Sequence, residues 1–105
     1  MAGFPEVLGE CTGFQWDAGN AEKNWQAHRV SQAEAEQIFF NRPVVVAPDF
    51  GHSQREVPYA ALGRTMVGRR LSVVFTIRGT LVRVISARDM GRRDRRLYAA
   101  VEAAQ

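Results

Sequence analysis

The chain has 105 residues and a mass of 11.7 kDa, the size of one small domain. Apolar residues make up 46% of it and charged residues 24%, proportions that are ordinary for a folded globule and exclude a largely disordered chain. No apolar run approaches the roughly 18–20 residues of a membrane span. The single cysteine, Cys11, excludes an intrachain disulfide, and no secretory signal is evident, so the cytoplasm is the expected compartment.

Charged residues are unevenly distributed along the chain. Residues 1–52 carry three basic and seven acidic side chains, a net charge of −4, whereas residues 53–105 carry eleven arginines and four acids, a net charge of +7. Thirteen of the fourteen basic residues are arginine, whose planar guanidinium matches phosphate better than the ammonium of lysine does. The C-terminal half is therefore expected to bind a polyanion or an acidic protein, unless its arginines form only a solvated basic face.

The first part of the chain predicts a short strand and two helices. Residues 1–12 have mixed polarity and are interpreted as a loose leader, and residues 14–16 alternate as a half-buried strand does. Asp17 is placed to cap the first helix. The side chains that share one face of this helix by spacing are Ala18, Ala21, Trp25 and His28. Ser31 and Glu34 form a capping-box pattern at the start of a second helix, which is expected to end before the next proline.

The middle of the chain predicts an antiparallel sheet. Residues 44–47 are β-branched and apolar and predict a strand. Residues 57–64 predict a weaker strand, for which Pro58 favours a place at the edge of the sheet. The clearest strands are residues 71–77 and 81–87, which a tight hairpin turn joins.

The chain is expected to close with a helix that Asp89 caps. The residues assigned to the apolar stripe of this helix are Met90, Leu97, Val101 and Ala104, with Tyr98 one position away. The aromatic residues assigned to the core are Trp16, Trp25, Phe39, Phe40 and Phe75. The predicted fold class is α+β: a short strand, two N-terminal helices, an antiparallel sheet of about four strands and a C-terminal helix, with residues 13–105 as one domain.

Three ordered blocks of residues carry a resemblance to a known family. They comprise Phe14-Gln15-Trp16-Asp17 with Asn24, His28, Val30 and Ser31, then Pro43, Asp49, His52-Ser53, Glu56 and Gly63, then Arg83-Val84-Ile85-Ser86-Ala87-Arg88 with Arg93, Arg96 and Tyr98. Over residues 13–98 the chain resembles the BrnT toxins of bacterial BrnT/BrnA toxin–antitoxin modules, which have a RelE-like fold. The resemblance implies a ribonuclease that slows translation and is neutralised by a BrnA-like ribbon-helix-helix antitoxin. It also implies that operator DNA is bound only through the toxin–antitoxin complex.

Four positions depart from the pattern of that family. Asn20 stands where a lysine is usual, Ala27 and Arg29 flank His28 where Lys-His-Gly is common, and Pro58 replaces a frequent arginine. These departures favour an alternative reading, in which the chain is a non-catalytic member of the fold that keeps a protein-binding or nucleic-acid-binding surface.

Cleavage of RNA without a metal ion requires a base, an acid, and cations that stabilise the charge on phosphorus. Arg83 interrupts an apolar strand and is expected on its open face, either as a phosphate ligand or in an ion pair with a nearby acid. Arg88, at the end of the same strand, is expected to bind phosphate or to pair with Asp89 or Glu56. Arg64, at the end of the weaker strand, is expected to reach the same cleft.

His28 is the candidate for proton transfer, with Lys23 as a second candidate, although His28 equally suits a capping or core position. The arginines expected to make general electrostatic contacts with a nucleic-acid backbone are Arg69, Arg70, Arg92 and Arg93. Asp49 and His52 are too few ligands for a metal ion, so neither a metal nor a cofactor is expected.

Overall fold

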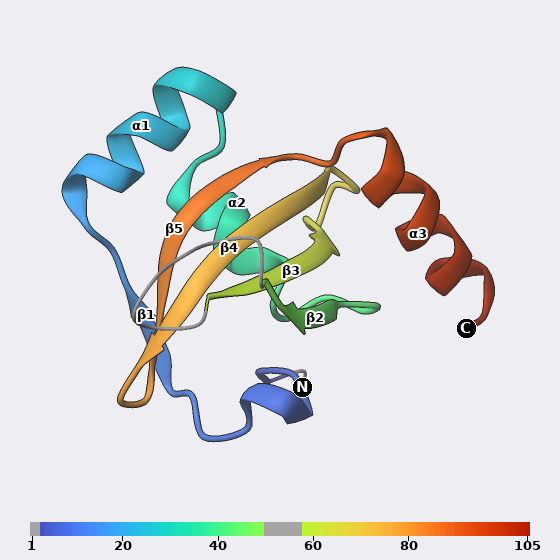
Figure 1. The fold of residues 1–105 in the computed structure, drawn as a ribbon, viewed down its shortest axis with the longest axis horizontal. Helices are drawn as coiled ribbons and strands as arrows, with labels where there is room; N and C mark the ends of the chain where they lie inside the picture. Colours follow the sequence, from blue (N-terminus) through green and yellow to red (C-terminus); the bar gives the residue numbers. More distant parts are fainter. Residues whose placement is uncertain (1–2, 50–57) are drawn as a thin grey trace.

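A computed structural model describes residues 3–49 and 58–105 of the chain (Figure 1). In chain order the elements are a short 3-10 helix η1 (Glu6–Leu8), β1 (Gly13–Gln15), α1 (Ala18–His28), α2 (Gln32–Gln37), β2 (Val45–Pro48), β3 (Tyr59–Arg64), β4 (Arg70–Arg78), β5 (Leu81–Asp89) and α3 (Arg92–Ala103). This order confirms the predicted α+β class. His52, Glu56 and the first residue of the predicted strand 57–64 lie outside the described residues. Within the described ranges no helix is both long and apolar enough to cross a membrane.

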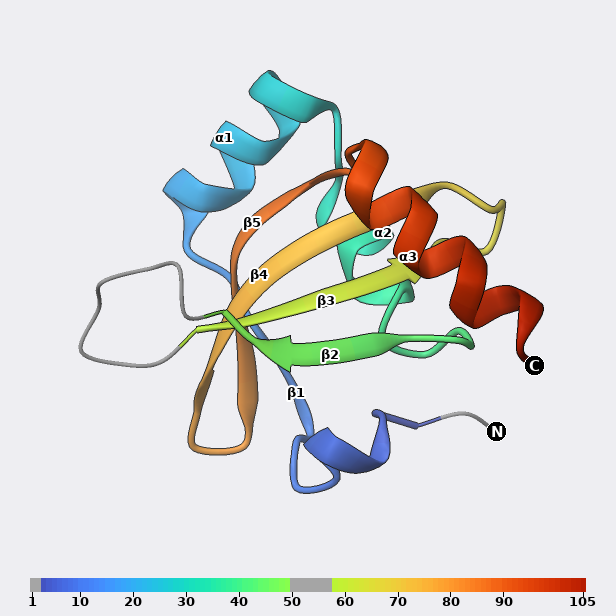
Figure 2. The ribbon, with the colours of Figure 1, turned by 45° about the vertical axis from the view of Figure 1, so that its right-hand side comes forward.

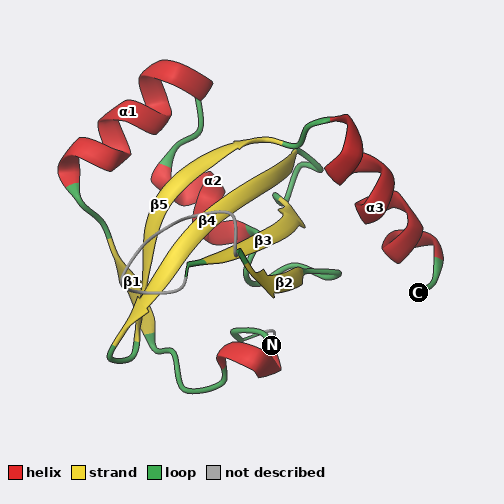
Figure 3. Cartoon of the chain, viewed as in Figure 1, coloured by secondary structure: helices red, strands yellow, loops and turns green. Residues whose placement is uncertain are grey.

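The five strands form one mixed sheet in the order β1-β5-β4-β3-β2 (Figure 3). Strands β2 to β5 are antiparallel, as predicted, and β1 adds a fifth strand that pairs parallel with β5, with Phe14 beside Val82. The four antiparallel strands and the short first strand are thus all present, and what the prediction did not include is the pairing of the short strand with the sheet. A three-residue strand whose partner lies 68 positions later carries no local signal of that pairing.

The expectation that Pro58 marks an edge strand was wrong, because β3 lies between β2 and β4. Pro58 precedes β3 and is itself buried, and its carbonyl accepts a hydrogen bond of 2.8 Å from the backbone N–H of Asp49. Proline lacks only the donor, so at this position it contributes the acceptor that the β2–β3 ladder uses and no ladder bond is lost.

Helices α2 and α3 lie on opposite sides of the sheet (Figure 2). The main core lies on the α2 side, where Phe39 of the segment after α2 meets Phe75 of β4 with ring centroids 5.2 Å apart. Gly63 of β3 permits this close packing, since a Cβ there would lie 2.8 Å from the Cβ of Ile38. Any side chain at residue 63 would therefore push the end of α2 away from the sheet.

Residues 3–12, which the sequence suggests are a loose leader, pack against the main core through Phe4 and Leu8. Leu8 of η1 is 2% exposed and belongs to the main core. The ring of Phe4 lies 5.2 Å from that of Phe14 and 4.9 Å from that of Phe40, measured between centroids. An isolated Phe and Leu among polar residues give no periodic signal, so their burial depends on partners distant in sequence.

The predicted starts of α1 and α2 are confirmed at the level of single hydrogen bonds. The carboxylate of Asp17 accepts from the backbone N–H of Asn20 at 3.1 Å. At α2 the hydroxyl of Ser31 accepts from the N–H of Glu34, and the carboxylate of Glu34 accepts from the N–H of Ser31. Both caps satisfy backbone donors that a helix start leaves without partners.

Predicted faces of α1 and α3 were wrong in part. Trp25, assigned to the core, is 46% exposed, and the buried residue of α1 is Asn24, whose side-chain oxygen accepts from the backbone N–H of Ala87 at 3.2 Å. Leu97, assigned to the inner stripe of α3, is 53% exposed, and Tyr98 is fully buried instead. Each helix packs through a residue that makes a hydrogen bond to a distant backbone group, which helical spacing does not reveal.

Asp89 does not cap α3, contrary to the expectation from the sequence. The N-cap is Gly91, and it makes no side-chain capping bond. Asp89 ends β5 and receives two hydrogen bonds from the guanidinium of Arg69, at 2.8 and 3.1 Å. A bidentate arginine is a stronger partner for a carboxylate than the neutral amides of a helix start.

Arg69, at the end of the β3–β4 turn, connects three parts of the fold. Besides the two bonds to Asp89, it donates to the carboxylate of Glu34 at 3.0 Å. It also donates to the backbone carbonyls of Arg29 and His28, at 2.8 and 3.0 Å. These bonds use all five N–H donors of the guanidinium. The ends of α1 and β5 and the start of α2 are thereby held around one side chain.

The two carboxylates of this cluster have pKa values below their ordinary range. Hydrogen bonds from Arg69 are the main cause of the lowered pKa of Asp89. For Glu34 the main cause of the lowered pKa is the hydrogen bond from the N–H of Ser31, with Arg69 contributing. A carboxylate with a lowered pKa stabilises the fold above the ordinary pKa, here 3.8 and 4.5, and this stabilisation is lost as the pH falls through the lowered value.

Replacing Arg69 by Met is expected to lower the free energy of unfolding at pH 7 by about 2–3 kcal/mol, because both carboxylates lose charged hydrogen bonds in a half-exposed setting. Urea unfolding at pH 7 and at a pH below both lowered values measures the effect. The difference between variant and wild type should shrink at the lower pH, where the carboxylates are protonated. Arg96→Met, at an exposed site on α3, is the control. Equal losses for the two variants would contradict the role given to Arg69.

Candidate functional site

The sheet face opposite α2 gathers arginines from three strands and is called here the arginine face. In the β3–β4 register Arg64 lies opposite Arg70, and in the β4–β5 register Ser72 lies opposite Arg88. Arg83 lies opposite Thr76, further along β4 on the same face. The four arginines of the arginine face are thus Arg64, Arg70, Arg83 and Arg88.

An irregularity in β5 places Arg83 and Arg88 on the same face. Strict alternation puts residues five positions apart on opposite faces of a strand. In the register Phe75 faces Val84 and Val74 faces Ser86, so Ile85 is an extra residue in β5. Such a bulge reverses the alternation beyond it.

Arg83 is loosely held by the protein. Its Nη2 lies 4.0 Å from Oδ2 of Asp17, and its side chain is 27% exposed. The other oxygen of Asp17 is engaged in capping α1. The ion pair that the sequence left as an alternative for Arg83 is therefore present only at the limit of contact. Most of the guanidinium donors of Arg83 have no partner among the residues that the structure describes.

Arg88 is exposed and makes no hydrogen bond or ion pair with any residue in 3–49 or 58–105. Asp89, one of its two predicted partners, is bound to Arg69 on the other side of the strand. Glu56, the other predicted partner, lies outside the described residues. Arg88 therefore presents its full set of donors beside the end of β5.

Arg64 and Arg70 are engaged with α3. Nη1 of Arg64 lies 2.9 Å from one oxygen of Glu102, and Nη2 of Arg70 lies 2.6 Å from the other. Arg64 also donates to the carbonyl of Arg42 at 2.9 Å. These two arginines belong geometrically to the arginine face, and they share the single negative charge of Glu102, which offsets one of their two positive charges.

Arg69 is one of the four arginines expected to contact a nucleic-acid backbone. In the structure all five of its donors bond to groups of the protein itself. Arg92 and Arg93 lie in the first turn of α3 and are exposed. They lie where the chain passes from β5 into α3 (Figure 1).

The two candidates for proton transfer lie on α1, which packs along β5 (Figure 1). His28 is exposed, and it lies near enough to Asp89 to make a small contribution to its lowered pKa, after the main contribution of Arg69. The imidazole thus lies near the side chain of Asp89, which is on the side of β5 away from Arg88. Lys23 is exposed five residues earlier and has no hydrogen bond or ion pair with a described residue.

Two buried polar residues, Thr76 on the arginine face and Asn24 on α1, are not among the site residues expected from the sequence. Thr76 is 3% exposed, and its hydroxyl has no hydrogen-bond partner within the described part of the chain. Asn24 is equally buried and leaves its amide nitrogen without a partner there. The signal available for Thr76 was the polar side of β4, where Ser72 and Thr76 alternate with the apolar residues of the core.

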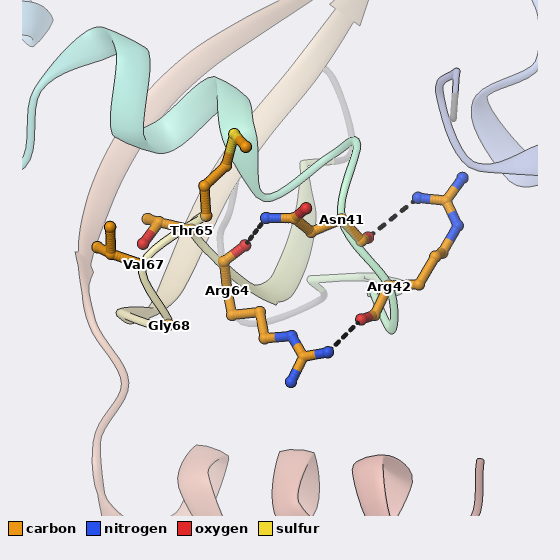
Figure 4. A pocket seen from close by; sticks show the side chains of 7 residues that line it. Asn41, Arg42, Arg64, Thr65, Val67 and Gly68 are labelled. Carbon is orange, nitrogen blue, oxygen red and sulfur yellow. Dashed lines mark hydrogen bonds between the residues drawn. The ribbon is translucent and has the colours of Figure 1, made fainter. Parts of the chain in front are cut away.

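A pocket of about 360 Å³ opens at the end of β3 (Figure 4). Its lining residues are Asn41, Arg42, Arg64, Thr65, Met66, Val67 and Gly68. The polar groups drawn in Figure 4 bond to one another: Asn41 donates to the carbonyl of Arg64 at 2.8 Å, and Arg42 donates to the carbonyl of Asn41 at 3.0 Å. The pocket therefore offers few unused donors. Within the described residues no three His, Cys, Asp or Glu side chains lie close enough to hold a metal ion.

Comparisons with known proteins agree with this architecture. A family model described as "Ribonuclease toxin, BrnT, of type II toxin-antitoxin system" matches residues 16–94. Among solved structures, the ribonuclease toxin BrnT of Brucella abortus matches with a TM-score of 0.59 and 20% sequence identity, over 77% of this chain and 99% of that chain. The structural likeness supports the fold, and the family rests on the match to the family model. A search of curated proteins gives no match.

Replacing Thr76 by Val is expected to raise the free energy of unfolding by about 1 kcal/mol, because a buried hydroxyl without a partner costs desolvation that a methyl group does not. The control is Thr80→Val, since the Thr80 hydroxyl accepts a hydrogen bond of 2.9 Å from Thr12. The free energy of unfolding of that variant should not exceed that of the wild type. Urea unfolding measures both, and a destabilised Thr76→Val would show that the hydroxyl has a partner in solution.

Proposed function

Because the chain belongs to the family of BrnT ribonuclease toxins of type II toxin–antitoxin systems, we propose that it cleaves RNA on the arginine face without a metal ion and thereby inhibits translation. The observation that carries the proposal is the pair Arg83 and Arg88, which share one sheet face and leave most of their donors without a partner among residues 3–49 and 58–105. Unused guanidinium donors on an exposed surface are suited to phosphate oxygens.

The spacing of the two arginines supports contact with a chain of phosphates. Their partners in β4, Thr76 and Ser72, are four residues apart, which corresponds to about 13 Å along a strand. Arg83 and Arg88 then bind different phosphates of one RNA strand. Arg88 is the candidate for the scissile phosphate, since His28 lies at the same end of β5.

The proposed reaction uses groups of the RNA and of α1. The imidazole of His28 removes the proton of a 2′-hydroxyl, and the 2′-oxygen attacks the adjacent phosphorus. The bond from phosphorus to the 5′-oxygen breaks, which leaves a 2′,3′-cyclic phosphate and a 5′-hydroxyl. Arg88 stabilises the charge that develops on the phosphoryl oxygens, and Lys23 is the candidate donor of the proton to the 5′-oxygen.

The proposed partner is a BrnA-like ribbon-helix-helix antitoxin, since the family pairs each toxin with an antitoxin. An acidic segment of such a protein suits the same exposed arginines and excludes RNA from them. Operator DNA is then bound through the antitoxin, and the setting of the whole module is the cytoplasm.

Replacing Arg83 and Arg88 together by Ala is expected to lower the rate of RNA cleavage by about 100-fold or more, because the developing charge loses the cation of Arg88 and a second phosphate of the RNA strand loses its contact with Arg83. The measurement is cleavage of purified RNA in excess EDTA, repeated in a translating extract to include ribosome-bound message. The control, Arg95→Ala with Arg96→Ala, removes the same charge from α3 and should retain most of the rate.

The outcome in which neither wild type nor variants cleave RNA in either format, with the fold intact by circular dichroism, would contradict the proposed activity. It would favour the binding-only alternative suggested by Asn20, Ala27 and Pro58.

A second prediction concerns the base. His28→Ala should cleave RNA about 100-fold more slowly, because general base catalysis is lost. Imidazole added to the solution should restore part of the rate, which a purely structural role of His28 does not predict. A rate close to that of the wild type would remove His28 from the mechanism.

A further inference from the structure

The C-terminal part of α3 lies over two arginines that face each other. Arg64 and Arg70 occupy directly opposite positions in the β3–β4 register, where like charges repel. The carboxylate of Glu102 lies between them, at 2.9 Å from one guanidinium and 2.6 Å from the other. Its side chain is 17% exposed. The arginine pair is therefore an anion site, and in this structure its occupant is a carboxylate from the same chain.

This anion site is continuous with the exposed arginines. Arg70 and Ser72 are successive residues of β4 on the arginine face, and Ser72 lies opposite Arg88. Arg70 and Arg88 are thus diagonal neighbours, with backbones roughly 7–8 Å apart. A polyanion bound at Arg88 therefore reaches Arg70 as well, if Glu102 does not already occupy the guanidinium of Arg70.

Helix α3 is attached to the sheet by few groups. Tyr98 is its one buried residue, and its hydroxyl donates to the carbonyl of Pro43 at 2.6 Å. Leu97, beside it, is half exposed. The family match ends at residue 94, so most of α3 lies beyond the matched region. Val101 is half-buried as well, so the attachment of α3 consists of one buried ring, one half-buried aliphatic side chain and the carboxylate of Glu102.

We propose that Arg64 and Arg70 form an additional phosphate site for the RNA strand, and that Glu102 competes with the RNA for this site. The inference rests on the proposed function, because it assigns an extension of the same RNA-binding surface. Glu102 occupies the site in the free protein and exchanges for a phosphate when RNA extends past Arg88. The competition weakens RNA binding, since an anion tethered to the same chain has a high effective concentration.

The test is binding of a single-stranded oligonucleotide with 2′-O-methyl groups, which cannot be cleaved, measured by fluorescence anisotropy over a range of salt concentrations. Glu102→Gln keeps the size of the side chain and removes its charge. It should bind the oligonucleotide about tenfold more tightly, and the dependence of log K on log salt should steepen by about 0.7 for one added phosphate contact.

The matched control is Asp94→Asn, which makes the same change of net charge on the same helix without touching the arginine pair. It should change the affinity by less than about twofold, as expected for a screened surface charge. Adding Arg64→Ala and Arg70→Ala to Glu102→Gln should abolish the gain. Circular dichroism and the fluorescence of Tyr98 and its surroundings report whether the variants keep the fold.

Equal affinities of Glu102→Gln and Asp94→Asn for the oligonucleotide would overturn the proposal. Tighter binding of a polyglutamate peptide by Glu102→Gln, with unchanged binding of the oligonucleotide, would assign the site to an acidic protein and overturn it as well. Because the probe is not cleaved, a wild type that binds it without cleaving RNA would refute the proposed activity and leave this site standing.

Discussion

The guanidinium of Arg69 is the contact on which the arrangement of the candidate site depends. Its five donors hold the end of α1, the start of α2 and the end of β5 around one point. By binding Asp89 it also removes the acid that follows Arg88 in the sequence. The same contact therefore holds the end of α1, with His28, near the end of β5, and among the residues that the structure describes Arg88 has no ion-pair partner.

The arginines of the C-terminal half divide into two groups that composition alone does not separate. Arg64, Arg69 and Arg70 are bound to carboxylates of the protein. Arg83 is loosely held, and Arg88 has no partner among the described residues. A polyanion binds to positive charges that are not already paired with carboxylates. The proposed site therefore rests on Arg83 and Arg88. An arginine of the other group contributes only where its carboxylate partner is displaced.

Local features of this fold were predictable from the sequence, and features set by distant contacts were not. The caps at Asp17 and Ser31 and the β4–β5 hairpin are confirmed because each depends on a few consecutive residues. The exposure of Trp25 was not predictable, because α1 docks on the sheet through the polar side chain of Asn24. Fold class followed from the order of elements, since the change from helical to strand periodicity is visible along the chain.

The candidate site was predictable in its residue types and only partly in its geometry. Period-two alternation places Arg83 on the face away from the core, yet the same rule separates it from Arg88. The bulge at Ile85 restores them to one face, and a single sequence gives no sign of it. Whether Arg64 is available to bind phosphate depends on Glu102, which lies 38 residues later. The two residues are in contact only because α3 packs over the sheet. Charge patterns thus indicate which residues suit phosphate, and tertiary contacts decide which of them remain available.

The most direct test of RNA binding on the arginine face is a map of the RNA-binding surface. Amide chemical shifts of the full chain, followed by NMR during titration with a 2′-O-methyl oligonucleotide, report which face of the sheet meets the RNA. The largest changes are expected on the arginine face, around Thr76, Arg83 and Arg88, and at the end of α1 at His28. Changes concentrated on η1 and α2, with the arginine face unaffected, would contradict this expectation.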